Sequence, residues 1–596
     1  MAEENFAAHN RGEQLELMGQ IVERSQKILA DFAKSSGGQG ANGHSPDPLN
    51  LAPMIMELSA RMMTNPAALF QAQFSLWQDY IDLWQSTSKR MLGHDTEPVI
   101  EPARDDRRFR DPAWNDDAVF SIIKQSYLLT SRWLTEVMND VDGLDDKTRQ
   151  KLDFYTRQFV DAIAPSNFVT TNPEVLRATL ESGGDNLLRG LNHLLTDLDR
   201  GKGKLAIRMT DQDAFDVGKN IATTPGKVVY QNDLLQLIQY EPTTEKAYKR
   251  PLLIIPPWIN KYYILDLQPK NSFIKYAVDQ GLTVFVVSWI NPDEAHAEKT
   301  FEDYMLEGPL AALDAIERAT GEKDVNAIGY CLGGTLLAAT LAYMAAKKDG
   351  RIKAATFFTA LTDFEDPGDL GVFIDEEQLA SMDEMMAEKG YLDGREMATT
   401  FNMLRANDLI WSFVINNYLL GKEPFPFDLL YWNSDSTRMP HAMHSFYLRE
   451  FYQNNKLVKP GGVTLDGVPI DLKKVRIPVY MLSTKEDHIA PWSSTYAATQ
   501  IFRGDTTFAL AGSGHIAGVI NPAASKKYGY WLNDKMPADP KDWLETATHH
   551  EGSWWPDWAG WIGKKSGTKV KARVPCKGKL KVIEDAPGSY VRIKAV

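Results

Sequence analysis

The sequence has few cysteines, no long apolar run and no excess of positive charge, and each shortage argues against a class of protein. Its 596 residues include two cysteines, Cys331 and Cys576, too few for a disulfide framework, which indicates a reducing compartment. The longest apolar runs, such as residues 252–255, fall far short of a transmembrane span. A net charge of −14 argues against a nucleic-acid partner. Residues 1–5 carry acids and no apolar export signal, so we expect a cytoplasmic protein.

One of the two thiols lies in the most informative stretch of the chain. Residues 325–330 are a short apolar run, residues 336–346 are rich in Leu and Ala, and Gly329-x-Cys331-x-Gly333 stands between them. This is the nucleophile-elbow spacing of α/β-hydrolases, whose glycines leave room for a strained strand-to-helix turn. A buried cysteine in such a turn can also be a plain packing residue. The elbow therefore needs support from the rest of the chain.

The N-terminal part of the chain has helical patterns. Residues 12–33 carry apolar positions at helical spacing, and a Gly- and Ser-rich linker follows at 34–40. A second helix is expected after Asn65-Pro66, and it carries an apolar stripe: Phe70, Phe74, Trp77, Ile81 and Trp84. The stripe either packs within this chain or a second copy, or stays exposed and docks on an apolar surface or partner. We expect a partly flexible helical region at 1–95 and an α-helical domain at 96–205.

From residue 206 the pattern changes to short β-rich runs. Two antiparallel strands, at 227–231 and 234–240, precede further strands: 252–255, 283–289, 325–330, 354–359, 479–483 and 506–511. Helices between most of the later strands predict the α/β-hydrolase fold, a mostly parallel sheet with flanking helices. The gap between 354–359 and 479–483 is too long for one crossover, which predicts a cap or lid insertion. We therefore expect a catalytic core at 206–365 and 475–596, with the cap at 366–474.

A thiol nucleophile needs a base, and the base needs an orienting acid. On this fold they follow in the chain order nucleophile, acid, base. Asp487 comes directly after the strand at 479–483, and His515 stands in a glycine-flanked loop after the strand at 506–511. Both positions lie where parallel strands end at one edge of the sheet. The sequence therefore predicts a triad of Cys331, Asp487 and His515.

Other residues are weaker candidates for these roles. Glu486 and Asp363 are alternative acids. The rival histidines are His441, His444, His488, His549 and His550. The first two have helical spacing but no evident carboxylate or cysteine partners, so we expect neither a metal nor a cofactor. Cys576, beside Pro575 and several lysines, is expected to be an exposed bystander.

Acyl transfer also requires donors for the oxyanion. The backbone N–H of Leu332, immediately after the nucleophile, is one. The other should come from the loop after residues 252–255, where Pro256 and Pro257 cannot donate, which leaves Trp258 or Ile259. We choose Ile259 for this role. Because a thiolate exchanges one thioester for another at little free-energy cost, the cysteine points to acyl-CoA donors and to transfer rather than hydrolysis.

Longer stretches resemble the polyhydroxyalkanoate synthases, most of all the single-subunit class I type. The similarity covers roughly residues 100–596 and rests on these motifs: PPWINKYYILDL at 256–267, SWINPD at 288–293, GYCLGGT at 329–335, FDLLYWN at 427–433, EDHI at 486–489, GHIAGVINP at 514–522 and GSWWPDW at 552–558. Many relatives have a cysteine where this chain has Trp258, so that position is not part of the chemistry. The first 95 or so residues carry little family signal.

The resemblance implies polymerisation of short-chain (R)-3-hydroxyacyl-CoA, such as 3-hydroxybutyryl-CoA, into polyester with release of CoA. The enzyme would be a homodimer on cytoplasmic granules. Cys331 would carry the growing chain as a thioester, His515 would deprotonate Cys331, and Asp487 would orient His515 or help to activate the incoming 3-hydroxyl. The segment around Trp432 would contribute to dimerisation and access, and the N-terminal helices to granule or phasin contact.

Other functions stay open on the residues alone. A thioesterase or polyester depolymerase shares the fold, and a non-enzymatic granule-coating protein would use only the apolar stripe. The basic tail between Lys564 and Lys581 could contact CoA phosphates, but a solvated surface is the simpler expectation.

Overall fold

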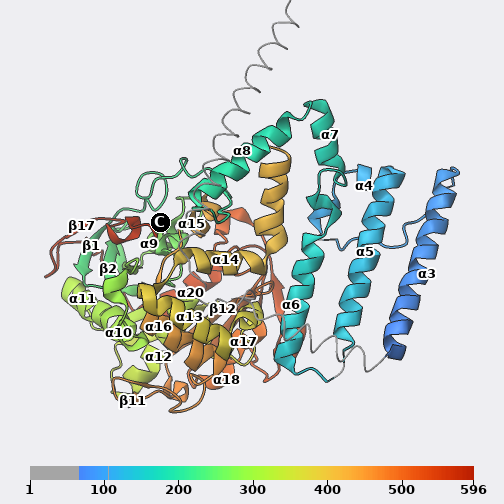
Figure 1. Ribbon diagram of the computed structural model, residues 1–596. Helices are drawn as coiled ribbons and strands as arrows, with labels where there is room; N and C mark the ends of the chain where they lie inside the picture. Colours follow the sequence, from blue (N-terminus) through green and yellow to red (C-terminus); the bar gives the residue numbers. More distant parts are fainter. Residues whose placement is uncertain (1–65, 95, 105, 142, 596) are drawn as a thin grey trace, which may run out of the picture. The chain divides into compact units, whose positions relative to one another are not determined.

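The computed structural model describes residues 66–94, 96–104, 106–141 and 143–595 (Figure 1). The chain divides by its contacts into two compact units, Met1–Asp211 with Phe401–Phe425, and Gln212–Thr400 with Pro426–Val596. The helical pattern at 12–33 and the linker after it lie outside the described residues. No helix in the described ranges is both long and apolar enough to cross a bilayer. The four segments expected from the sequence stay a prediction; residues 401–425 group with the first unit.

The first unit is built from helices. They are α3 (Pro66–Met91), α4 (Ala113–Asp116), α5 (Ala118–Asn139), α6 (Asp146–Ala162), α7 (Pro173–Glu181) and α8 (Asp185–Arg200), with π-helical turns η7 (Asn407–Trp411) and η8 (Val414–Leu419). Side-chain caps begin several of them, as where Asp117 accepts hydrogen bonds from the N–H groups of Val119 and Phe120 at the start of α5. The helix α5 packs between α3 and α6, and the three lie side by side in Figure 1.

The helix α3 buries only one of its faces. Leu83 is buried, and the hydroxyl of Tyr80 lies 2.8 Å from the hydroxyl of Thr130 on α5. The stripe expected from the sequence lies on the other face, where Phe70, Phe74, Trp77 and Trp84 are 74%, 48%, 59% and 72% exposed. The aromatic members of the stripe are therefore exposed in the part of the chain that the structure describes.

The second unit is organised around an 11-stranded sheet, in the order β15-β14-β13-β12-β7-β6-β4-β5-β2-β1-β17. The strands are β1 (Gly226–Gln231), β2 (Leu235–Tyr240), β4 (Leu252–Ile255), β5 (Val284–Trp289), β6 (Val325–Tyr330), β7 (Ile352–Phe358), β12 (Val479–Thr484), β13 (Thr506–Ala511), β14 (Tyr530–Leu532), β15 (Thr548–His550) and β17 (Glu584–Asp585). In the middle of the sheet, the neighbouring strands β13, β12, β7, β6, β4 and β5 run parallel to one another. The strands at both ends of the sheet pair antiparallel. The predicted α/β-hydrolase fold is confirmed.

Apolar sequence explains the centre of this unit. The strand β4 reads Leu-Leu-Ile-Ile and is buried throughout, as expected for a parallel strand covered on both faces. The main helices are α9 (Phe273–Asp279), α10 (Phe301–Met305), α11 (Ala311–Thr320), α12 (Leu332–Ala346), α17 (Trp492–Tyr496), α18 (Ala498–Ile501), α19 (Pro540–Thr546) and α20 (Trp555–Lys565). The helix α12 is apolar on all sides and almost wholly buried, so it is the central core helix.

Several helices lie in the insertion between β7 and β12. They are α13 (Glu376–Lys389), α14 (Gly394–Leu404), which spans the unit boundary, α15 (Asp428–Ser434), α16 (His441–Phe446) and the π-helix η9 (Tyr447–Gln453). Two small ladders join β8 (Tyr391–Leu392) to β9 (Met439–Pro440) and β10 (Thr464–Leu465) to β11 (Val468–Pro469), and a third joins β3 (Lys246–Tyr248) to β16 (Lys569–Lys571).

The segment 584–595 covers the outer edge of the sheet. The strand β17 pairs antiparallel with β1, with Lys227 opposite Asp585 and their charged groups 2.6 Å apart. Further on, the hydroxyl of Tyr590 donates to the carbonyl of Asn232 at 2.8 Å. This edge of the sheet is therefore paired rather than open.

Candidate active site

Cys331 lies at the turn between β6 and α12. Its backbone has φ 52° and ψ −122°, a conformation that L-residues rarely adopt. The surrounding glycines allow this, because a Cβ at Gly333 would stand 2.2 Å from the carbonyl oxygen of Ile255 and one at Gly334 would stand 2.4 Å from Ala360. The thiol is half-buried. The strained turn thus presents the sulfur at the carboxyl edge of the parallel strands.

A fixed carboxylate stands beyond the end of β12. Asp487 is buried, and its Oδ1 accepts hydrogen bonds of 2.9 Å from the N–H groups of Ile489 and Ala490. Its Oδ2 accepts one of 3.2 Å from the hydroxyl of Thr484 and lies 2.7 Å from Nδ1 of His515. Every oxygen of this carboxylate is therefore occupied, and the imidazole is held in one orientation.

The imidazole of His515 joins this carboxylate to the thiol. Burial by itself lowers the pKa of His515, but the charges of Asp487 and of the Cys331 thiolate, with hydrogen bonds to both side chains, raise it to about 10. The ring of Tyr330 stacks on the imidazole, with the two ring centroids 5.9 Å apart. The three residues expected from the sequence lie together, and the raised pKa of His515 favours an imidazolium at neutral pH.

The two expected oxyanion donors belong to the elbow and to the loop after β4. Leu332 is the first residue of α12, where backbone N–H groups have no intrahelical acceptor. The loop after β4 lies against this helix start, since Gly333 packs on the carbonyls of Ile255 and Pro256. Trp258 is buried against Tyr304, with ring centroids 4.6 Å apart, whereas Ile259 is partly exposed.

Comparison with known proteins adds family evidence to this geometry. The family model described as "Poly-beta-hydroxybutyrate polymerase (PhaC) N-terminus" matches residues 105–277, and the "alpha/beta hydrolase fold" model matches residues 250–522. The poly(3-hydroxyalkanoate) polymerase of Methylorubrum extorquens is 51% identical over 590 residues, which cover 99% of this chain and 97% of that protein. The chain belongs to the poly(3-hydroxyalkanoate) polymerase family. As a member it is an enzyme, which excludes a purely granule-coating role.

Further members of the poly(3-hydroxyalkanoate) polymerase family are nearly as similar. The poly(3-hydroxyalkanoate) polymerase subunit PhaC of Rhizobium meliloti (strain 1021) is 50% identical over 579 residues, covering 97% of this chain and 94% of that protein. Among solved structures, a hydrolase from Pseudomonas aeruginosa PA01 is 14% identical, covers 49% of this chain and 92% of its own, and has a TM-score of 0.30.

The alternative acids and histidines considered from the sequence lie elsewhere in this polymerase or make other contacts. Glu486 is exposed, and Asp363 accepts a hydrogen bond from the amide of Asn455 at 2.7 Å. His549 and His550 lie on β15, toward the sheet edge. His444 is buried, and burial lowers its pKa to about 4. No group of three or more His, Cys, Asp or Glu residues in the described ranges could hold a metal ion.

Two tyrosines near the thiol were not predicted from the sequence. Tyr447, in η9, packs against Tyr452 with ring centroids 5.4 Å apart. Burial is the main cause that raises the pKa of both phenols, and the charge of Cys331 contributes, so both stay protonated as hydrogen-bond donors. In the sequence they appear only as members of an aromatic-rich helical stretch, which gives no sign of their place beside the nucleophile.

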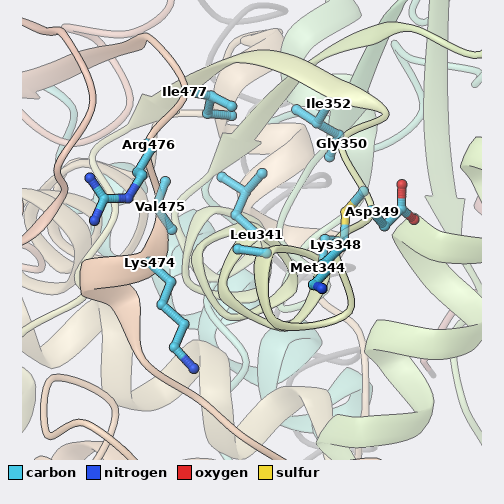
Figure 2. Close-up of a pocket in the computed structure, with 11 residues that line it drawn as sticks. Leu341, Met344, Lys348, Asp349, Gly350, Ile352, Lys474, Val475, Arg476 and Ile477 are labelled. Carbon is cyan, nitrogen blue, oxygen red and sulfur yellow. The ribbon is translucent and has the colours of Figure 1, made fainter.

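A pocket lies at the opposite end of α12 from Cys331. It has a volume of about 250 Å³, with an apolar part formed by residues such as Leu341 and Ile352, near the start of β7. Figure 2 shows that the charged ends of Lys474 and Arg476 point away from Leu341. The pocket is therefore separate from the candidate active site, and its cations do not converge on a common point.

Proposed function

We propose that this chain polymerises (R)-3-hydroxyacyl-CoA into polyhydroxyalkanoate with release of CoA, and that Cys331 carries the acyl chain as a thioester. Short-chain monomers such as 3-hydroxybutyryl-CoA are the proposed substrates. The observation that carries the proposal is a half-buried thiol on a strained elbow, beside an imidazole that a buried carboxylate orients. A thiolate nucleophile is matched to a thioester donor, since each transfer replaces one thioester with another.

In the proposed acylation step, the sulfur of Cys331 attacks the carbonyl carbon of the acyl-CoA. The developing oxyanion receives hydrogen bonds from the N–H groups of Leu332 and Ile259. The bond from carbon to the CoA sulfur then breaks, and the imidazolium of His515 returns a proton to the departing thiolate. The products are an acyl thioester on Cys331 and free CoA.

In the proposed transfer step, the 3-hydroxyl of one hydroxyacyl unit attacks the thioester of another. An ester bond forms, a sulfur–carbon bond breaks, and the hydroxyl proton passes to His515. Asp487 orients and charges the imidazole in this scheme, because each of its oxygens already accepts a hydrogen bond and its side chain has no exposed surface. Of the two roles considered for Asp487, orientation of His515 is thus the better supported.

We also propose that the enzyme works on cytoplasmic polyester granules. The exposed stripe on α3 supports this, because a row of large aromatic side chains on one helix face is suited to the apolar surface of the product. A homodimer and contact with phasins stay predictions from the family resemblance.

The test is incubation of the purified protein with 3-hydroxyacyl-CoA substrates of increasing chain length. We expect CoA release with insoluble polyester, fastest for 3-hydroxybutyryl-CoA, and loss of both for Cys331→Ala. CoA release with free hydroxy acid and no polymer would identify a thioesterase instead. An active Cys331→Ala variant would remove the assigned nucleophile.

A further inference from the structure

Two sequence motifs far apart in the chain lie together beside the candidate active site. They are the loop that follows β4 and the segment from α15 to Thr437. The N–H of Thr437 donates to the carbonyl of Ile259 at 3.0 Å, and Asn260 forms an antiparallel bridge with Ser436. Just before them, the indole N–H of Trp432 donates to the carbonyl of Lys261 at 2.7 Å. The segment therefore fastens the very stretch of loop that carries the proposed second oxyanion donor.

A buried ion pair completes this attachment. Nζ of Lys261 lies 2.8 Å from Oδ1 of Asp435, and the two side chains are only 3% and 6% exposed. The hydroxyl of Tyr263 donates to the other oxygen, Oδ2 of Asp435, at 2.8 Å. Burial lowers the pKa of Lys261, and the charge of Asp435 opposes that shift.

Such a pair needs a reason other than stability. Removing two charges from water costs about as much as their attraction returns, so a buried ion pair seldom stabilises a fold more than apolar side chains of the same size. A buried ion pair can instead fix the relative position of two segments, because any other arrangement would leave a buried charge without its partner. Here that arrangement involves a loop whose upstream end is already fixed, since Ile255 pairs with Gly329 next to the elbow.

We propose that Lys261, Asp435 and Tyr263 are positioning residues, which hold the backbone N–H of Ile259 where the oxyanion forms. The loop is fastened at two places: upstream by its pairing to β6, and downstream by the buried ion pair. Between them lie Trp258 and Ile259, whose carbonyl oxygens share the one hydroxyl proton of Thr437. With these carbonyls turned to Thr437, the intervening peptide has a fixed orientation. This inference rests on the proposed function, because it assigns geometry to the proposed acylation step.

The first test compares Lys261→Met with a matched control, Lys299→Met. Lys299 also forms an ion pair, 2.6 Å from Glu307, but it is more exposed. We expect the rate of CoA release in the first turnover to fall about 10- to 100-fold in Lys261→Met, since one oxyanion donor moves out of place. Lys299→Met should stay within about twofold of the unchanged protein.

A second measurement separates positioning from general damage. Alkylation of Cys331 by iodoacetamide forms no oxyanion, so its rate in Lys261→Met should match that of the unchanged protein. Lys261→Arg, which keeps a cation, should recover part of the acylation rate. The double variant Lys261→Met with Asp435→Leu should regain thermal stability, because no buried charge is left unpaired. Its acylation should stay slow, because the ion pair that joins the loop to the segment is also lost.

Tyr263→Phe removes a single hydrogen bond to Asp435 and tests the same proposal if Lys261→Met does not fold. We expect a smaller loss of acylation rate, about threefold, with KM unchanged. Folded variants that acylate as fast as the unchanged protein, or that lose acylation and alkylation equally, would overturn the proposal. Failure of the unchanged protein to release CoA would instead overturn the proposed function, so the two failures are distinguishable.

Discussion

Cys331 depends on its neighbours for the backbone conformation that presents its sulfur. Gly329, Gly333 and Gly334 each approach another part of the backbone or a side chain so closely that no Cβ fits. The G-x-C-x-G spacing therefore reports a packing requirement as well as a chemical one. This is why the elbow could be located from the sequence without any knowledge of the sheet.

Gly333→Ala should test this requirement. The new Cβ would stand 2.2 Å from the carbonyl oxygen of Ile255, so the elbow must shift away from β4. We expect a lower melting temperature and a loss of acylation of tenfold or more. Gly560→Ala is the control, because that helical glycine has open space around it and alanine favours helix by about 1 kcal/mol. Equal activity in both variants would contradict this account of the turn.

His444 should give the fold a dependence on acidic pH. Burial lowers its pKa to about 4, against the nearby charge of Asp383, which His441 also approaches at 3.7 Å. The unfolded chain, with a pKa near 6.5, then binds more protons between about pH 4 and 6.5, so stability falls as the pH drops through that window. The cost of lowering the pH from 6.5 to 5 should be about 2 kcal/mol.

The measurement is the melting temperature at pH 7.5 and pH 5. In His444→Gln the loss on acidification should be clearly smaller than in the unchanged protein. His549→Gln, at a side chain that is 41% exposed, should leave the loss unchanged. If His444→Gln loses as much as the unchanged protein, another group causes the acid sensitivity.

At the scale of elements, α3 has two faces with different roles. The face with Leu83 packs on α5, and the face with the aromatic stripe is exposed. We expect that changing Phe70, Trp77 and Trp84 to Ser weakens binding to polyester particles about tenfold or more, because most of the exposed apolar area is lost. Turnover of soluble substrate should change little, since the proposed chemistry lies in the other unit.

Sedimentation with polyester particles would measure this binding. The matched control changes three exposed polar residues of the same helix, Gln71, Gln78 and Gln85, to Ser. Particle binding that survives loss of the aromatic residues would show that α3 is not the docking element.

Elements differ in how far the sequence determines them. The strand β4 is a continuous apolar run, so local sequence alone predicts it. The strand β17 consists of Glu584 and Asp585, which have no preference for strands and pair only because β1 offers an open edge. Likewise, the sequence gives no sign that Trp432 is buried and donates to the carbonyl of Lys261, and the role of its segment in dimerisation and access stays a prediction. Tertiary contacts decide such cases.

At the scale of the whole molecule, each of the two units has buried clusters of its own. Phe109, Trp114 and Tyr127 belong to a cluster in the first unit, whereas Trp554 and Trp558 of the 552–558 motif pack within the core of the second. All residues proposed for the chemistry belong to the second unit. That they lie close together was predictable, because each follows a parallel strand and parallel strands end at the same edge of the sheet. The Lys261–Asp435 pair was not, since two charged residues far apart in sequence look like ordinary surface residues.

The pairing of β17 with β1 has a consequence for how the protein must be handled. A protease cut just before residue 584 would strip a strand from the sheet and leave the N–H and C=O groups of β1 bare. Such a row is a template on which strands of other molecules can add. Clipped material should therefore precipitate on storage even though its thiol, imidazole and carboxylate are all untouched.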